Sequence, residues 1–344
     1  MAPEKRIVLP ARDSTGTLMT PLLEILGLCM SFGTGLFQGG RKIQALAGID
    51  LTVAAGNTVG IAGESGCGKT TLARCALRLL EPTAGSIRFD GQDLLKLSPA
   101  ELRIRRREFQ IVFQDPFASL DPRMTTAEIL MEPFIIHGMK KREGSAAPVP
   151  ELLRQVGLDD SVAGRHPAEL SGGQQQRVAI ARTLALQPRL LIADEPVSAL
   201  DASVQVQILN LLANLRQSLG LTLILISHSL PVIRYLCTRV VVMYLGRIVE
   251  EDGAEEFFRG PRHPYSQALL ESVPAMKPEC HRIKPVLHGD VPSPAAPPPG
   301  CPFHPRCPRA WARCREERPA LERVEGTTAA KVACFLWPAG TRRP

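Results

Sequence analysis

Residues 63–71 of this chain read Gly63-Glu64-Ser65-Gly66-Cys67-Gly68-Lys69-Thr70-Thr71. The spacing of glycines, lysine and hydroxyl residue fits a P-loop, in which backbone N–H groups turn inward around phosphate. We expect Lys69 to neutralise the outer phosphates and the Thr70 hydroxyl to bind magnesium. An ordinary glycine-rich turn is the alternative, and the segments on either side decide between the two. The predicted nucleotide-binding residues are Gly63, Ser65, Gly66, Cys67, Gly68, Lys69, Thr70 and Thr71.

The flanking segments have the pattern that a P-loop needs, a strand before it and a helix after it. Residues 59–62 are apolar throughout, which is typical of a strand buried on both faces of a parallel sheet. Between residues 69 and 80, apolar side chains recur at helical spacing, and residues 81–85 have turn chemistry. Three further apolar runs read as buried strands: 190–193, 223–226 and 240–243. We therefore predict an α/β domain with a parallel sheet covered by helices.

Composition excludes several classes of protein. The chain has 344 residues, 44% of them apolar and 22% charged, which is typical of a globular protein with a core. Its longest apolar runs, 221–226 and 240–245, are far shorter than the roughly 20 residues of a membrane-spanning helix. The first 20 residues mix charged with apolar side chains and lack a secretory signal pattern. We expect a cytoplasmic protein.

The formal charge of +7 does not identify a partner. Basic runs such as 103–107 fit solvated faces, nucleic acid, an anionic ligand or an anionic membrane surface.

The chain divides into two parts by composition. We assign residues 22–260 to the α/β domain, with a helical subdomain inserted at about 97–175 and a polar loop at 143–150. Residues 261–344 form a small extension that holds 16 of the 30 prolines, so regular structure should be sparse there. Residues 293–300 read as a proline-rich linker that leads directly to a group of cysteines.

An acidic pair, Asp194-Glu195, follows the apolar run 190–193. An aspartate at the carboxyl end of a central parallel strand reaches magnesium at a P-loop, and an adjacent glutamate polarises the attacking water. The alternative is a helix that begins with two acids. The P-loop favours the first interpretation, so we predict Asp194 as a magnesium ligand and Glu195 as the catalytic base.

A further motif, Leu170-Ser171-Gly172-Gly173-Gln174, narrows the class. With the P-loop before it and the acidic pair after it, the chain resembles the nucleotide-binding subunit of an ATP-binding cassette (ABC) transporter. The resemblance implies a P-loop NTPase (RecA-like) core that hydrolyses ATP with Mg²⁺. Ser171, Gly172 and Gly173 would form a second anion-binding helix end, which in this family meets the γ-phosphate held by a partner subunit. The resemblance therefore implies a head-to-tail dimer.

Other positions match the family one by one. Gln114 resembles the Q-loop glutamine that touches magnesium or water, although a glutamine before Asp-Pro also occurs in ordinary loops. Asp201, in the segment 198–201, resembles the D-loop at the dimer seam. His228, just after a predicted strand, fits the switch histidine that contacts the γ-phosphate, and the alternative is a structural histidine. Phe32 is the candidate for stacking on adenine, and the alternative is a core phenylalanine.

Three segments resemble peptide importers in particular: residues 113–122, 263–270 and 289–294. They are similar to dipeptide and oligopeptide importer ATPases, a branch that nickel importers share, and the resemblance extends over roughly residues 22–336. It implies a paralogous ATPase partner in a heterodimer, two transmembrane permease subunits and an extracytoplasmic solute-binding protein. It also implies a peripheral position on the cytoplasmic face of the inner membrane. Ser229 departs from the family, which often has aspartate there, and Gln175 stands where a basic residue is common.

Four of the nine cysteines gather near the end of the chain: Cys301, Cys307, Cys314 and Cys334. A segment rich in proline and arginine offers little core to bury them, and four thiolates suit zinc or an iron–sulphur cluster. The peptide importers that share this tail point to a 4Fe-4S cluster. We favour the cluster over zinc, with a metal-free tail as the third alternative, and expect a structural role.

Two other classes compete with the importer ATPase. A soluble ABC ATPase that acts on nucleic acid usually carries two cassettes or a long insertion, and this chain has one P-loop and no such insertion. A non-catalytic regulatory subunit would be expected to have a damaged acidic pair, and Asp194-Glu195 is intact. We therefore expect an active ATPase that binds no nucleic acid.

Overall fold

A mixed eight-stranded sheet runs through the centre of the structure, in the order β11-β12-β10-β9-β3-β8-β7-β6. The computed structural model describes residues 21–33, 42–139, 148–273, 289–327 and 329–337. The parallel strands are β3 (Thr58–Ala62), β6 (Phe109–Val112), β7 (Leu190–Asp194), β8 (Thr222–Ile226) and β9 (Arg239–Tyr244). The antiparallel edge consists of β10 (Arg247–Gly253), β11 (Glu322–Arg323) and β12 (Lys331–Val332). The predicted parallel sheet is confirmed.

The two faces of this sheet pack against different layers. Strands β3, β7 and β8 are buried at every position, as their apolar runs predict. On β7, Ile192 faces a core shared with α1 (Lys69–Ala76), whereas its neighbour Ala193 faces the core of the helical layer. The helices on that second face are α6 (Gly172–Leu184), α7 (Ala202–Leu219) and α8 (Leu230–Leu236).

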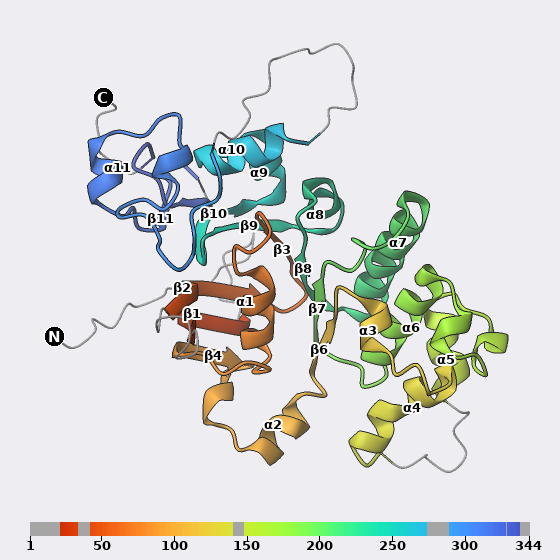
Figure 1. The fold of residues 1–344 in the computed structure, drawn as a ribbon. Coiled ribbons are helices and arrows are strands. Elements are labelled where there is room, and N and C mark those ends of the chain that lie inside the picture. Colours follow the sequence, from red (N-terminus) through yellow and green to blue (C-terminus); the bar gives the residue numbers. More distant parts are fainter. Residues whose placement is uncertain (1–20, 34–41, 140–147, 274–288, 328, 338–344) are drawn as a thin grey trace.

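A second sheet, which the sequence did not suggest to us, covers the other side of α1. It is antiparallel, in the order β2-β1-β4-β5. Its strands are β1 (Pro21–Gly33), β2 (Lys42–Ala54), β4 (Ala84–Phe89) and β5 (Gln92–Asp93). Figure 1 shows α1 lying beside this sheet, so the helix that follows the P-loop is enclosed between two sheets.

The helical part lies to one side of the main sheet (Figure 1). It contains α3 (Pro116–Ser119), α4 (Thr126–Ile136), α5 (Pro148–Gln155) and the start of α6, with short 3₁₀ turns at Asp160–Val162 and Pro167–Glu169. The structure differs from our predicted 97–175 at the N-terminal end. The 3₁₀ turn Leu94–Lys96 and helix α2 (Pro99–Arg105) both come before β6. Because β6 pairs with β7 in the main sheet, the helical insertion begins only after Val112. Of the predicted loop 143–150, residues 143–147 lie outside the described residues and Pro148 begins α5.

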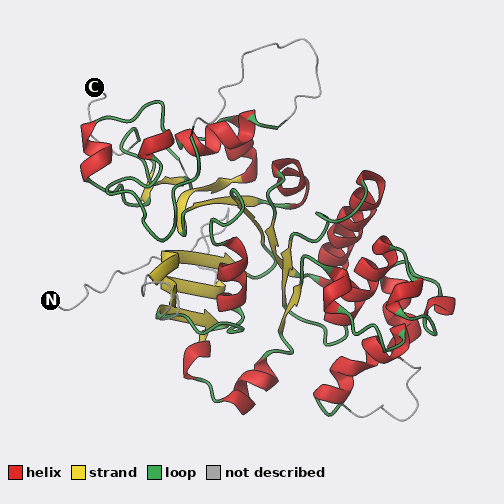
Figure 2. Cartoon of the chain, in the orientation of Figure 1, coloured by secondary structure: helices red, strands yellow, loops and turns green. Residues whose placement is uncertain are grey.

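The described part of the C-terminal extension has little regular structure, as expected (Figure 2). After α9 (Ala254–Arg259) it contains α10 (Pro264–Glu271), a 3₁₀ turn at His304–Arg306 and α11 (Ala312–Glu316). The two-residue strands β11 and β12 attach it to β10, so the extension continues the main sheet. None of the described helices is long and apolar enough to cross a bilayer.

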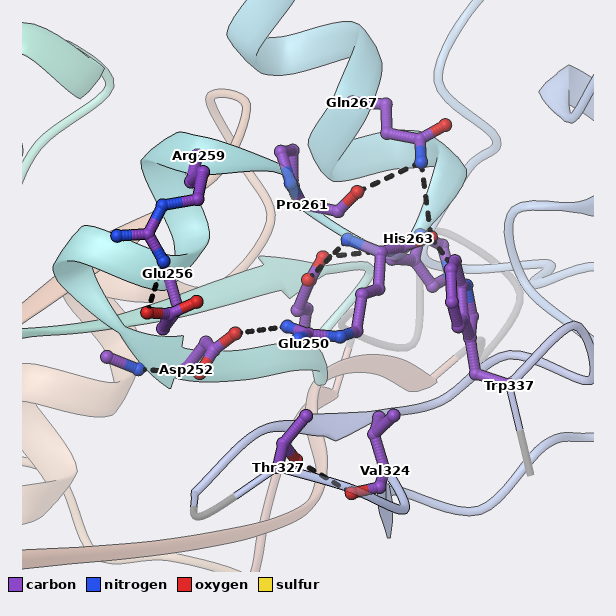
Figure 3. Close-up of polar contacts among 12 residues, drawn as sticks. Glu250, Asp252, Glu256, Arg259, Pro261, His263, Gln267, Val324, Thr327 and Trp337 are labelled. Carbon is purple, nitrogen blue, oxygen red and sulfur yellow. Dashed lines mark hydrogen bonds and ion pairs between the residues drawn. The ribbon is translucent and has the colours of Figure 1, made fainter. Parts of the chain in front are cut away.

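A buried polar network fixes the extension to β10 (Figure 3). The Glu250 carboxylate accepts the backbone N–H groups of Arg262 at 2.6 Å and of His263 at 2.9 Å. Asp252 forms an ion pair with the Arg262 side chain, and Trp337 Nε1 donates to the Arg262 carbonyl at 2.8 Å. Burial raises the pKa of Glu250 and lowers the pKa of His263 to about 3. The extension is therefore held by buried hydrogen bonds as well as by apolar contact.

Candidate nucleotide site

The P-loop connects β3 to α1 and depends on glycine at two positions. Gly63 has φ 151°, and a Cβ atom there would collide with the carbonyl oxygen of Met243. Gly68, the residue before α1, has φ 105°, and a Cβ there would lie 2.6 Å from the Ala45 oxygen. Only glycine fits both the backbone conformation and the space.

Lys69 places its charge inside this loop. Its side chain is only 5% exposed, and Nζ donates to the carbonyl oxygens of Gly63 at 2.7 Å and Glu64 at 2.9 Å. A bound phosphate would compete with these carbonyls for the ammonium group, since both are acceptors and the phosphate is charged. The role of Lys69 at the outer phosphates stays a prediction.

Thr70 and Asp194 meet across 124 residues of sequence. The Thr70 hydroxyl donates to Asp194 Oδ1 at 3.2 Å, and Asp194 is 2% exposed at the end of β7. Burial raises the pKa of Asp194, and the neighbouring Glu195 carboxylate adds to this. A hydroxyl and a carboxylate oxygen at the foot of a phosphate loop are ligands that suit Mg²⁺, and a bound cation would relieve the repulsion.

The three predicted catalytic residues converge on one point. Glu195 Oε2 lies 3.1 Å from His228 Nδ1 and accepts from Gln114 Nε2 at 3.3 Å. Glu195 has φ 47°, and its N–H donates to the Ile226 carbonyl at 2.9 Å. The His228 side chain is 60% exposed, which argues against a purely structural histidine. The arrangement can hold a water molecule beside a carboxylate, as general-base catalysis requires.

The serine-glycine motif lies at the start of α6. Ser171 precedes α6, its hydroxyl accepts the Gln174 N–H, and the Gln174 side chain accepts the Ser171 N–H in return. A Cβ atom at Gly173 would lie 2.6 Å from Val204 Cγ1, so α6 begins in close contact with α7. Asp201 directly precedes α7. Among the described residues, no hydrogen bond joins this helix end to the P-loop of the same chain.

Phe32 is not a core residue. It lies near the end of β1, opposite Ile43, and its exposed fraction is 40%. The alternative of a core phenylalanine is therefore wrong, while adenine stacking stays a prediction. Ser65 lies in the loop before α1 and is exposed, whereas Thr71 lies in the first turn of α1.

The four C-terminal cysteines are free thiols in the described part of the extension, and a charge on the other three acts on Cys334. Cys301 N–H donates to the Cys314 carbonyl at 2.8 Å, and both side chains are buried. Burial raises the pKa of Cys301 to about 11 and of Cys334 to about 12, and charge on the other thiolates contributes to both shifts. No group of three or more ligating side chains among the described residues is arranged to hold a metal ion. The donor set fits a thiolate-bound metal, but the thiols are not placed at ligating geometry.

One contact of the P-loop was missed by sequence reasoning. Glu64, which we did not single out, pairs with Arg306 of the extension, and its N–H donates to the Tyr265 hydroxyl at 2.8 Å. The residues are more than 200 positions apart, and no local pattern signals the contact.

A buried lysine in a glycine loop, a hydroxyl–carboxylate pair and a glutamate at a strand end together define a P-loop nucleoside triphosphatase. Comparison with known proteins agrees. Residues 46–198 match the family described as "ABC transporter", and residues 249–314 match "Oligopeptide/dipeptide transporter, C-terminal region".

Relatives match over nearly the full length. A putative peptide import ATP-binding protein of Brucella ovis is 48% identical over 305 residues, 89% of this chain and 95% of that protein. The dipeptide transport ATP-binding protein DppF of Escherichia coli is 44% identical over 321 residues, 93% of this chain and 95% of that protein. A solved dimer of the ATP-binding cassette MJ0796 bound to ADP and Pi has a TM-score of 0.61 and 31% identity, covering 67% of this chain and 98% of that one. This chain belongs to the ABC transporter ATP-binding family and is an ATPase.

Proposed function

We propose that the chain is the ATP-hydrolysing subunit of a peptide importer. The match of residues 249–314 to the oligopeptide/dipeptide transporter C-terminal region carries this proposal, because the description of that region names the cargo class. Relatives named for peptide import that share about half of the sequence support it. The cargo itself would be selected by a permease and a solute-binding protein.

The site supports a two-half-site mechanism. The P-loop of this chain binds the triphosphate, Thr70 and Asp194 hold Mg²⁺ together with Gln114, and Phe32 stacks on adenine. The helix end at Ser171, Gly172 and Gly173 contacts the γ-phosphate held by a partner ATPase, with Asp201 at the seam. Among the described residues no hydrogen bond joins the P-loop to the helix end at Ser171, which supports pairing of each half-site with a second subunit. We favour a paralogous partner, in a heterodimer.

Chemistry then follows from the three converging side chains. Glu195 accepts a proton from the attacking water, His228 contacts the γ-phosphate, and Gln114 orients the water or Mg²⁺. Closure of the two ATPase subunits would move helices of two permease subunits, and hydrolysis would reset them. We place the chain at the cytoplasmic face of the inner membrane, attached through the permease.

The test is transport by the assembled complex. The full chain is co-expressed with its partner ATPase and the two permease subunits, and the purified complex is placed in lipid vesicles with the solute-binding protein and a labelled dipeptide or oligopeptide. ATP-dependent peptide uptake that Glu195→Gln abolishes is the expected result. Uptake of nickel without peptide would favour the nickel-importer alternative. Recovery with DNA or ribosomes instead of a permease would overturn the proposal.

We also propose that Cys301, Cys307, Cys314 and Cys334 hold a 4Fe-4S cluster, in preference to zinc. Four thiols in one extension, with Cys301 and Cys314 buried and joined by a backbone hydrogen bond, supply the donor set that such a cluster needs. Their role would be structural. Iron and sulphide analysis of anaerobically purified protein tests the proposal, and zinc without iron, or no metal at all, would overturn it.

A further inference from the structure

The C-terminal extension reaches into the P-loop. Arg306 Nη1 donates to Glu64 Oε2 at 2.7 Å, and Nη2 donates to Oε1 at 3.0 Å, so the guanidinium group holds the carboxylate with both nitrogens. The two residues are 242 positions apart in sequence. Paired hydrogen bonds of this kind fix orientation as well as charge.

Glu64 is also held through its backbone. Its N–H donates to the hydroxyl of Tyr265, which is another residue of the extension, at 2.8 Å. Its carbonyl accepts from Lys69 Nζ at 2.9 Å and from the Cys67 N–H at 3.3 Å. A single residue of the loop therefore connects the extension to the lysine that is to meet the phosphates.

The extension presents Arg306 from a rigid support. Arg306 is only 8% exposed, and its guanidinium carbon lies 6.0 Å from the centre of the Tyr244 ring. Tyr244, Tyr265 and Phe303 pack together with ring centres 4.7 to 5.4 Å apart. Tyr265 follows His263, which the Glu250 network anchors to β10 (Figure 3). The arginine therefore has little freedom to leave Glu64.

We propose that Arg306 is a positioning residue for nucleotide binding, which neutralises the Glu64 carboxylate and holds it away from the phosphate cradle. Without Arg306, this carboxylate would stand uncompensated in a loop built to bind a highly charged anion, and would repel it. The role concerns binding and not hydrolysis, because Arg306 makes no hydrogen bond to Glu195, His228 or Gln114 in the described structure. The proposal rests on ATP binding and not on the identity of the cargo.

The test is a double-mutant cycle in the full-length chain, with ATP binding measured through a fluorescent ATP analogue. Arg306→Gln should raise the Kd for ATP about five- to tenfold, in the range of typical coupling between neighbouring groups. Adding Glu64→Gln should restore the Kd to within about twofold of the Glu64→Gln variant alone, because the uncompensated charge is gone. In the assembled ATPase, Arg306→Gln should raise KM and leave kcat nearly unchanged.

A matched control is Arg315→Gln, which removes an exposed arginine from the same extension and should leave the Kd unchanged. An unchanged Kd in Arg306→Gln would overturn the proposal. So would an equal loss with and without Glu64→Gln, since Arg306 would then act only on the fold of the extension. If Arg306→Gln does not fold, Arg306→Met, which removes the charge and keeps an apolar stem at this buried position, is carried through the same cycle, and the same two outcomes decide.

Discussion

His228 Nδ1 lies 3.1 Å from Glu195 Oε2. The same carboxylate oxygen accepts a hydrogen bond from the Gln114 side chain at 3.3 Å. The three residues come from the ends of different strands, so the sheet itself brings them together. Glu195 is the centre of the group, and its backbone adopts a φ of 47°, which few non-glycine residues adopt. A residue held in such a conformation by its surroundings is expected to matter for function.

Replacing Glu195 by glutamine should separate binding from chemistry. The amide keeps the size of the side chain and removes the base, so ATP binding should persist while turnover falls at least about 100-fold. Steady-state phosphate release and nucleotide binding measure the two effects. Glu256→Gln, an exposed acid paired with Arg259, is the control and should behave as wild type. Near-normal turnover in Glu195→Gln would remove Glu195 from its role as base.

The Thr70–Asp194 pair predicts a change in magnesium requirement. Thr70→Val keeps the shape of the side chain and loses the hydroxyl that lies 3.2 Å from Asp194. We expect the Mg²⁺ concentration for half-maximal ATPase activity to rise about tenfold or more. Thr70→Ser keeps the hydroxyl and should retain nearly the wild-type requirement. Equal magnesium dependence in the valine and serine variants would contradict the assignment.

The buried parallel strands and the P-loop could be predicted because their signals are local. Each of the runs 59–62, 190–193, 223–226 and 240–243 lies within a strand whose bounds differ by at most a residue or so. Strands buried on both faces are apolar throughout, and glycine spacing around a lysine is equally direct. The helix that the sequence predicts after the P-loop, up to residue 80, is too long. Helix α1 ends at Ala76, and the chain turns at Arg78, which has φ 49°.

The antiparallel sheet and the Arg306–Glu64 pair could not be predicted in the same way. Pairing between β1 and β2 contains several register shifts, for example between Leu28 and Cys29, which break the alternation that marks a half-buried strand. The contact of Arg306 with Glu64 depends on the folding of an extension without strong periodicity. Such contacts are set by tertiary packing and leave no trace in local sequence.

The contact of Gly173 with Val204 predicts a large effect from a single methyl group. A Cβ atom at Gly173 would lie 2.6 Å from Val204 Cγ1, so Gly173→Ala should force α6 and α7 apart and destabilise the chain by about 1–3 kcal/mol. At Gly172 the nearest contact, Leu200 Cδ2, is 3.5 Å away, and Gly172→Ala should change the melting temperature little. Val204→Ala should rescue Gly173→Ala. Equal melting temperatures for the two glycine variants would contradict this packing argument.

Burial of His263 predicts a stability that falls in acid. Its pKa is lowered from 6.5 to about 3 by burial in the folded chain, so below pH 6.5 the unfolded chain binds a proton that the folded chain does not. The contribution of neutral His263 to the free energy of unfolding is therefore present above pH 6.5. It is lost as the pH falls toward 3, by up to about 1.4 kcal/mol per pH unit. Glu250, whose pKa is raised by burial, acts in the opposite direction as the pH falls.

The His263 contribution is isolated by comparison with His263→Asn. His263 Nδ1 accepts the Tyr265 N–H at 3.1 Å, and asparagine offers an oxygen to the same donor, so the start of α10 should be kept. Glu250, Asp252 and Arg262 are present in both proteins, so their titration cancels to first order in the difference between the two unfolding free energies. We expect the advantage of wild type measured by urea unfolding at pH 8 to shrink at pH 5. A difference that is the same at both pH values would show that His263 does not titrate between the folded and unfolded states as its burial requires.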